Sequence, residues 1–426
     1  MLKFVIKRLL YGILVLWGVV TLVFSIFSIN PGDPAKMLLG QRVDEESLAA
    51  VNRELGLDLS WHKQYLLYLN DLSPISFHSQ DKNSRAYFVK DKYNGVELLS
   101  VGEKTLVLKQ PYLRRSFQSR KPVSEIIVEA MPGTIILALF SIGFAVLFGV
   151  VFGVIAAVKK GTSLDDGLIF SAVLGMSTPS FFSAIIISWL GGYVWADQIK
   201  IPAILVVFGL LGFLISLGIR KKISLKRSLS FTFKGLGMGL LILAIEFFTR
   251  NTLNFGFIPD SFTLNLPGTG LNMTGSLYSV DVFEGEYLSL QNLILPMITL
   301  GIRPLAVVIQ LTRNAMLDVV SQDYIRTAKA KGLSRNVVLF KHALRNALNP
   351  VVTAVSGWFA SMLAGAVFIE FIFNWKGLGL RVFQSLQNDD YPVIMGSVLV
   401  IAAIFVLINI LVDIIYGIID PRVRIT

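Results

Sequence analysis

Residues 134–158 read TIILALFSIGFAVLFGVVFGVIAAV, a run of 25 residues without one charged side chain. The hydrocarbon core of a bilayer is about 30 Å thick, and about 20 apolar residues of helix are enough to cross it. Seven other runs meet this test almost free of charge, at 9–29, 168–190, 201–219, 229–248, 293–311, 348–373 and 393–416. The sequence therefore predicts an all-α polytopic membrane protein with eight spans.

The composition excludes several classes of protein. The chain has 426 residues, of which 54% are hydrophobic and 16% charged, and such an apolar chain is not an ordinary soluble enzyme. It has no cysteine, so it has no disulfide, no thiolate nucleophile and no zinc site of the cysteine type. It also lacks a G-x-x-x-x-G-K-[ST] phosphate loop and a recognisable catalytic combination. We expect a conduit that is not an enzyme and holds no cofactor or metal, driven by an ion gradient, downhill flow or a partner.

The positions of Lys and Arg predict the orientation, because cytoplasmic connections of membrane proteins are rich in both. The net charge is +11, and the connections on one predicted side carry Lys3, Lys7 and Arg8; Lys159 and Lys160; Arg220, Lys221, Lys222, Lys226 and Arg227; the stretch 313–345; and Arg422 and Arg424. Both termini are therefore expected in the cytoplasm, and topology explains the basic excess without nucleic-acid binding. The first span has no small-x-small cleavage pattern after it, which predicts an uncleaved anchor.

The long outer segment, 30–131, is expected to hold a small α+β unit. Asp44 can cap a short helix that Gly56 ends. Residues 86–110 alternate apolar and polar side chains, with turn signals at Asn94-Gly95 and Gly102-Glu103, and they predict a β-meander of about three strands.

The loop at 322–350, QDYIRTAKAKGLSRNVVLFKHALRNALNP, is more organised than a connector needs to be. Asp323 can cap a short amphipathic helix, Gly332 permits a left-handed turn, and Ser334 can cap a second helix. The pattern favours a helix-turn-helix that stands off the membrane. The alternative is a basic amphipathic helix lying on anionic headgroups.

This loop resembles the signature loop of a known family. The A-x-x-x-G element at Ala328 and Gly332 is similar to that of the permease subunits of ATP-binding-cassette (ABC) importers, in the oligopeptide, dipeptide and nickel branch. Arg326 stands where many importers outside this branch carry Glu, and Leu344-Arg345 replaces their Leu-Pro. Further matching stretches are IKRLLYGILVLWGVVTLVF, INPGDPA, ELGLDLSWHKQYLLYL, RSFQSRKPVSEII, GMSTPSFF, FIEFIFNWKGLGLRV, NDDYPVIMGSVL and IDPRVR, in the family's order.

The resemblance implies a six-helix permease core. It divides the chain into an N-terminal transmembrane helix at 1–29, the outer segment at 30–131 and the core at 132–426, with a cytoplasmic coupling loop at 313–347. Two stretches depart from the family pattern. One is the expected meander, near 73–113, and the other is an additional helical hairpin within 196–251. The hairpin could lie at the periphery and face lipid, or it could have a role in gating or in partner docking.

The resemblance also implies partners. The chain would work in the bacterial cytoplasmic membrane with a second permease subunit, two ABC ATPase subunits and an extracytoplasmic solute-binding protein, and ATP and Mg would bind to the ATPases. The coupling residues it implies are Asp323 as helix cap, Tyr324 and Ala328 as packing face, Gly332 as turn, and Arg326, Lys329 and Lys331 as charge contacts. The substrate stays open among peptides, nickel, sugar-like oligomers and antibiotic peptides, as does homodimeric or heterodimeric pairing. The rival readings are a gradient-driven transporter or channel without an ATPase, and a membrane enzyme or assembly scaffold.

Charged residues within predicted spans are candidate functional groups, because charge at bilayer depth is costly. Arg303 could face the pore and bind a peptide carboxylate, or it could pair with Glu246 or another buried acid. Glu246 and Glu370 are expected to reach interfacial water, and Asp413 is expected to be a buried hydrogen-bonding anchor. Pro179 should allow a bend, and Gly143, Gly149 and Gly153 should allow close helix packing.

Overall fold

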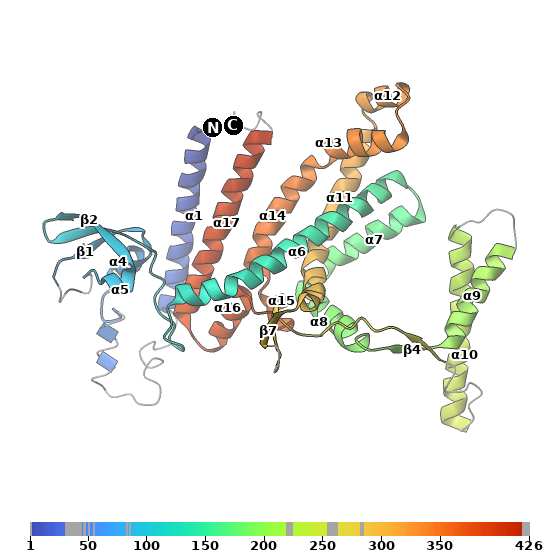
Figure 1. Cartoon of the computed structure of the whole chain (residues 1–426), viewed down its shortest axis with the longest axis horizontal. Coiled ribbons are helices and arrows are strands. Elements are labelled where there is room, and N and C mark those ends of the chain that lie inside the picture. The colour runs from blue at the N-terminus through green and yellow to red at the C-terminus, as the bar shows by residue number, and fades with distance from the viewer. Residues whose placement is uncertain are drawn as a thin grey trace.

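The fold is a set of long apolar helices, in a computed structural model that describes residues 2–29, 45, 48–49, 52–53, 56–81, 84, 87–218, 225–253, 263–281 and 285–419. The longer helices are α1 (Leu2–Ile29), α6 (Val123–Val158), α7 (Ser163–Ser177), α8 (Ser180–Trp189), α9 (Ala203–Gly218), α10 (Leu225–Leu253), α11 (Ile294–Val320), α14 (Asn349–Gly365) and α17 (Tyr391–Ile419). Shorter ones are α4 (Trp61–Leu72), α5 (Lys90–Tyr93), α12 (Asp323–Ala330), α13 (Arg345–Ala347), α15 (Val367–Ile372) and α16 (Leu378–Gln387). Short π-helices are η1 (Leu190–Val194) and η3 (Val337–Leu344), and η2 (Leu290–Leu293) is a 3-10 helix. Figure 1 shows their arrangement.

Five helices of the described part of the chain are long and apolar enough to cross a bilayer, and a bent pair brings the number to six. The five lie at Val5–Ser28, Val123–Val158, Leu229–Arg250, Leu290–Val320 and Tyr391–Ile414. The expected span at 168–190 is instead the bent pair, because the chain turns by 110° between Ser177 and Ser180. The expected span at 348–373 is divided into α14 and α15 at Ala366. A polytopic helical membrane protein is confirmed, and the count of eight spans stays a prediction.

Helices α6 and α11 form the most extensive helix–helix contact, and glycine makes their close approach possible. A Cβ atom on Gly149 would lie 2.7 Å from the Val308 side chain, and one on Gly153 would lie 2.5 Å from Thr312. A Cβ on Gly143 would meet nothing within 4 Å. The close helix packing expected at the glycines is therefore confirmed at Gly149 and Gly153, whereas Gly143 faces away from the contact.

The first and last helices bring both ends of the described chain together. Helices α1 and α17 lie side by side, and the start of α1 lies at the same end of the molecule as the end of α17 and as α12 (Figure 1). An ion pair joins them, with 3.0 Å between Arg8 Nη1 and Asp413 Oδ2. Asp413 anchors α17 to α1, but it is half-buried rather than buried as expected, and its partner is an arginine. The C-terminal Arg422 and Arg424 lie outside the described residues.

The outer segment contains an antiparallel sheet of three strands, ordered β1-β3-β2. The strands are β1 (Ile75–Ser79), β2 (Gly95–Val101) and β3 (Lys104–Lys109). The turn expected at Gly102-Glu103 joins β2 to β3, but the first strand begins before residue 86, and Lys90–Tyr93 form a helical turn. The alternation rule located the hairpin and missed β1, which pairs with β3 across a gap in sequence. Asp44, the expected helix cap, lies outside the described residues.

Helices α9 and α10 form a hairpin that packs mainly on itself and lies apart from the other helices (Figure 1). Its two helices approach closely, because a Cβ on Gly212 would lie 2.2 Å from the Phe231 carbonyl oxygen. A two-stranded ribbon of β4 (Ile199–Pro202) and β5 (Thr263–Leu266) connects it to the rest of the chain. A further ribbon consists of β6 (Tyr278–Asp281) and β7 (Gly285–Leu288).

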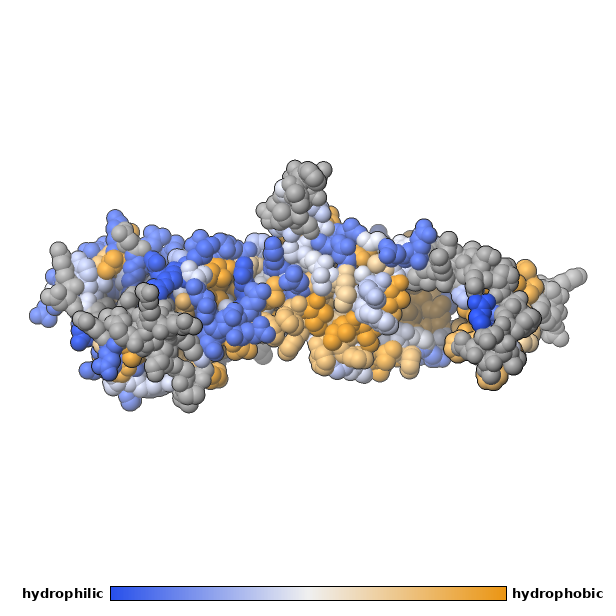
Figure 2. All heavy atoms as spheres, turned by 90° about the horizontal axis from the view of Figure 1, so that it is seen from below, coloured by the Kyte–Doolittle hydropathy of each residue, from blue (hydrophilic) through white to orange (hydrophobic). Residues whose placement is uncertain are grey.

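Hydrophobic residues cover much of the surface. Seen from the end opposite α12, they gather near the middle of the molecule, whereas hydrophilic residues dominate the side that carries the sheet β1-β3-β2 (Figure 2). Exposed apolar side chains on α8 include Phe181, Phe182 and Ile185. Such a large apolar surface is typical of a protein that contacts lipid or a partner subunit.

Candidate functional site

Residues 313–320 of the expected coupling loop are the last part of α11, and the rest of the loop starts with α12, which projects from one end of the molecule (Figure 1). The helix starts at Asp323, and Gln322 occupies the N-cap position without a side-chain cap bond. The expected cap role of Asp323 is therefore wrong: it is a first-turn carboxylate near the positive end of the helix dipole. Its Oδ1 lies 3.2 Å from Arg326 Nη1, and both side chains are exposed.

One face of α12 is anchored to the membrane helices. Ile325 and Ala328 are buried in a cluster with Val154 of α6 and Met316 of α11, to which Val338 of η3 also belongs. The three-residue spacing of the two anchors places them on one face of the helix. Ala328, an expected packing residue of the loop, shares this face with Ile325.

Tyr324, expected beside Ala328 on the packing face, lies at its edge. Its side chain is 39% exposed, and its hydroxyl accepts a hydrogen bond of 2.7 Å from Asn346 Nδ2. This bond joins the start of α12 to the end of the loop, across 22 residues. Tyr324 therefore closes the base of the loop.

The turn after α12 depends on Gly332. Its φ is +75°, in the left-handed region that L-residues with a Cβ rarely adopt. The chain then enters η3, a π-helical stretch that continues into α13 and α14. The helix-turn-helix is confirmed, and its second helix is wound more widely than an ordinary α-helix.

The remaining coupling residues form an exposed, positively charged surface. Arg326, Lys329 and Lys331 are exposed, and so are Arg335 and Lys341 farther along the loop. A surface of this kind attracts acidic partners or anionic headgroups.

A buried ion pair beside the loop was missed by the sequence analysis. Arg313 of α11 binds Asp165 of α7 through two bonds, 2.7 Å from Nε to Oδ1 and 2.8 Å from Nη2 to Oδ2. Asp165 also accepts a bond of 2.9 Å from the Gly161 backbone N–H, in the turn between α6 and α7. The pair therefore fixes this turn to the last part of α11, which leads to α12. The sequence signal for this ion pair is the presence of opposite charges at the ends of two neighbouring predicted spans.

The environment of Arg303 differs from the one that an ion pair with a buried acid would require. It is exposed on α11, and it makes no ion pair or side-chain hydrogen bond with any residue that the structure describes. Glu246 pairs instead with Arg250, with 3.1 Å between Oε1 and Nη2. Of the alternatives for Arg303, pairing with Glu246 is not seen in the described part of the chain, and Arg303 is exposed on the surface of this subunit.

Glu370 was expected to reach interfacial water, and this is wrong as well, because it is fully buried. Its Oε1 accepts a bond of 2.7 Å from Thr134 Oγ1, and its Oε2 accepts one of 2.9 Å from the Leu380 N–H. The Thr134 oxygen also accepts a bond of 2.8 Å from the Leu378 N–H. Glu370 and Thr134 thus hold the first turn of α16 against α6.

We expect Thr134→Val to destabilise the protein by about 1–3 kcal/mol, because it removes the hydrogen bond to Oε1 of the buried Glu370 carboxylate and leaves the Leu378 N–H without its acceptor. The loss should appear as a lower midpoint of thermal unfolding in detergent. Thr353→Val is the matched control, since the Thr353 hydroxyl on α14 is exposed. Equal midpoints for the two variants would contradict the role given to Thr134.

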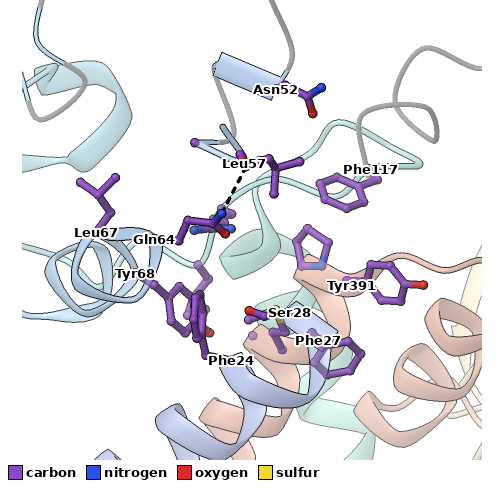
Figure 3. A pocket seen from close by; sticks show the side chains of 16 residues that line it. Phe24, Phe27, Ser28, Asn52, Leu57, Gln64, Leu67, Tyr68, Phe117 and Tyr391 are labelled. Atoms are coloured by element: carbon purple, nitrogen blue, oxygen red, sulfur yellow. Dashed lines mark hydrogen bonds between the residues drawn. The ribbon is translucent and has the colours of Figure 1, made fainter. Parts of the chain in front are cut away.

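A cavity of about 440 Å³ lies at the opposite end of the molecule from α12. It is lined by the end of α1, the start of α17 and α4, and Phe24, Phe27, Tyr68 and Tyr391 surround it in Figure 3. Gln64 is held at its edge by a bond of 2.8 Å to the Leu59 carbonyl oxygen. In the described residues no group of His, Asp and Glu is arranged to hold a metal ion.

Comparisons with known proteins agree with this architecture. A family model described as "Binding-protein-dependent transport system inner membrane component" matches residues 149–425, and a model of the N-terminal part of such components matches residues 1–86. The chain is 31% identical to the dipeptide transport system permease protein DppB of Alkalihalophilus pseudofirmus, with both chains covered completely. It is 32% identical to the di/tripeptide transport system permease protein DppB of Pseudomonas aeruginosa and 31% identical to the DppB protein of Escherichia coli K12, each over 100% of this chain and 99% of the relative. The resemblance is thereby confirmed, and the chain belongs to the family of binding-protein-dependent transport system inner membrane components, which are permease subunits of ABC importers.

Proposed function

We propose that the chain is the pore-forming permease of an ATP-driven importer, and that α12 with its turn is the docking element for an ATPase partner. The anchored side of α12 carries this proposal. Ile325 and Ala328 pack on α6 and α11, so a displacement of α12 is transmitted directly to two long membrane helices. The Arg313–Asp165 pair adds the α6–α7 turn to the same rigid unit.

Short peptides are the proposed substrates, because relatives that match the whole chain are named as dipeptide and di/tripeptide permeases. The proposed assembly contains a second permease subunit, two ATPase subunits that bind ATP and Mg, and an external solute-binding protein. Both termini and α12 are placed in the cytoplasm, in keeping with the clusters of Lys and Arg at that end. The α9–α10 hairpin is placed at the periphery, facing lipid.

Arg303 is assigned to the translocation path. It is exposed on a helix whose opposite side packs on α6, so it faces the second subunit, the pore or lipid. Lipid is the costly choice for a charge at this depth, and a guanidinium can bind a peptide carboxylate through two bonds.

We expect Arg303→Gln to lower peptide uptake about tenfold or more, as loss of a charged hydrogen-bond donor costs about 1.5–3 kcal/mol. The ATPase activity and the amount of assembled protein should stay near wild type. Unchanged uptake by a correctly assembled variant would contradict the assignment.

Gly332→Val tests the docking element itself. A β-branched residue at a φ of +75° is strained by about 1–3 kcal/mol, so the turn between α12 and η3 should change its path. We expect loss of most transport-coupled ATPase activity while the chain remains in the membrane. Gly332→Asn is the matched control, since Asn tolerates the left-handed conformation, and it should keep most of the activity.

A gradient-driven transporter without an ATPase is the alternative. It predicts that both Gly332 variants transport alike, and that uptake stops when the proton gradient is removed. Normal ATPase coupling in Gly332→Val would contradict the docking role of this turn.

A further inference from the structure

A second cavity, of about 460 Å³, lies beneath the coupling loop. Its walls are the ends of α6 and α11, with Val158, Leu317 and Val320, and the start of η3, with Leu339. These side chains are aliphatic. The volume lies within the range of about 300–1,000 Å³ that small-molecule sites occupy.

Two cations line the same cavity, Lys329 of α12 and Arg335 before η3. Both are exposed, and neither makes an ion pair or a side-chain hydrogen bond with the part of the chain that the structure describes. Other arginines nearby are neutralised, since Arg326 pairs with Asp323 and Arg313 with Asp165. No acidic residue is among the described residues that line the cavity. The cavity therefore combines aliphatic walls with two uncompensated positive charges.

The cavity lies between the ends of two candidate membrane helices. Val158 is the last residue of α6 and Val320 the last of α11, and both helices are candidate spans. A basic pocket between the cytoplasmic ends of membrane helices suits an anionic lipid headgroup. A nucleotide would need a stacking surface for its base, and the lining offers aliphatic side chains instead.

We propose that this cavity binds an anionic phospholipid, with an acyl chain against the aliphatic walls and the phosphate between Lys329 and Arg335. The assignment to the cytoplasmic leaflet rests on the orientation given under the proposed function, whereas binding does not require an ATPase partner. A bound lipid would join α12 to the ends of α6 and α11, and so would stabilise the element proposed to dock the ATPase.

Photolabelling of the full chain tests the site. The protein is placed in nanodiscs of phosphatidylcholine with a small fraction of phosphatidylglycerol that carries a diazirine on one acyl chain. We expect label in peptides of the α6 end, the α11 end and η3. Each cation near a membrane surface contributes about fivefold to anionic lipid binding, so the double variant Lys329→Gln and Arg335→Gln should lower labelling about 25-fold.

A matched double variant, Lys331→Gln and Lys341→Gln, removes the same charge from the same loop outside the cavity. It should change labelling less than twofold. Val158→Phe narrows the cavity with both cations intact, and it should also abolish labelling. The proposal is overturned by equal labelling from a phosphatidylcholine analogue, by equal losses in the two double variants, or by full competition from millimolar inorganic phosphate. Because the isolated chain is used, a failure here leaves the Gly332 test of ATPase docking unaffected.

Discussion

Asp165→Asn is expected to destabilise the protein by about 3–5 kcal/mol, because it leaves the Arg313 guanidinium partly buried without its carboxylate. The wild-type pair has two bonds, and the Asp165 side chain is only 2% exposed. The variant also loses charge at the acceptor of the Gly161 N–H bond, which holds the α6–α7 turn. We therefore expect a much lower midpoint of thermal unfolding in detergent, and less folded protein in the membrane.

The neighbouring residue supplies the control for this prediction. Asp166 is exposed one position farther along α7, so Asp166→Asn makes the same chemical change without a buried partner, and it should alter stability by less than about 0.5 kcal/mol. A second variant, Asp165→Asn with Arg313→Gln, should regain part of the loss, because no uncompensated buried charge remains. Similar midpoints for Asp165→Asn and Asp166→Asn would show that the pair is not structural.

Ile325→Ala should detach α12 from the membrane helices. Ile325 is fully buried, and truncating such a side chain costs about 2–5 kcal/mol. Because α12 has only eight residues, this loss is expected to open the helix locally and leave α6 and α11 folded. Amide hydrogen exchange in residues 323–330 should accelerate about 30-fold or more, and transport should lose its dependence on ATP hydrolysis.

Thr327→Ala is the control on the same helix. Thr327 is exposed, and its hydroxyl bonds only to the Asp323 carbonyl oxygen in the described part of the chain. Exchange and coupling should stay near wild type. If Ile325→Ala exchanged slowly and coupled normally, the anchored face of α12 would not transmit motion.

The sequence predicts the parts of this protein that depend on local pattern. Residues 134–158 form one helix because a long apolar run has no other stable state in a bilayer. The turn at Gly332 and the bend at Pro179 follow from backbone chemistry at single positions. The coupling loop was located from its own residues together with a family resemblance.

Contacts between distant residues were out of reach of the same rules. The partner of Glu370 is Thr134, 236 residues earlier, and backbone N–H groups complete its site without any sequence signal. Asp165 and Arg313 lie 148 residues apart. The helix breaks at Ala366 without a proline, and the residues around the break are apolar, so the sequence gives no sign of it. The expected cap at Asp323 is off by one position, because Gln322 occupies the N-cap and Asp323 is the first residue of the helix.

We propose that an ATPase partner drives this permease. The most direct test of this proposal is a pull-down of the full chain from its native membrane in mild detergent, with identification of the bound proteins and an ATPase assay on the eluate. We predict that ATPase subunits and a second permease are recovered and that the eluate hydrolyses ATP, with both lost in Gly332→Val. Recovery of the chain alone, without ATPase activity and with uptake that stops when the proton gradient is removed, would contradict it.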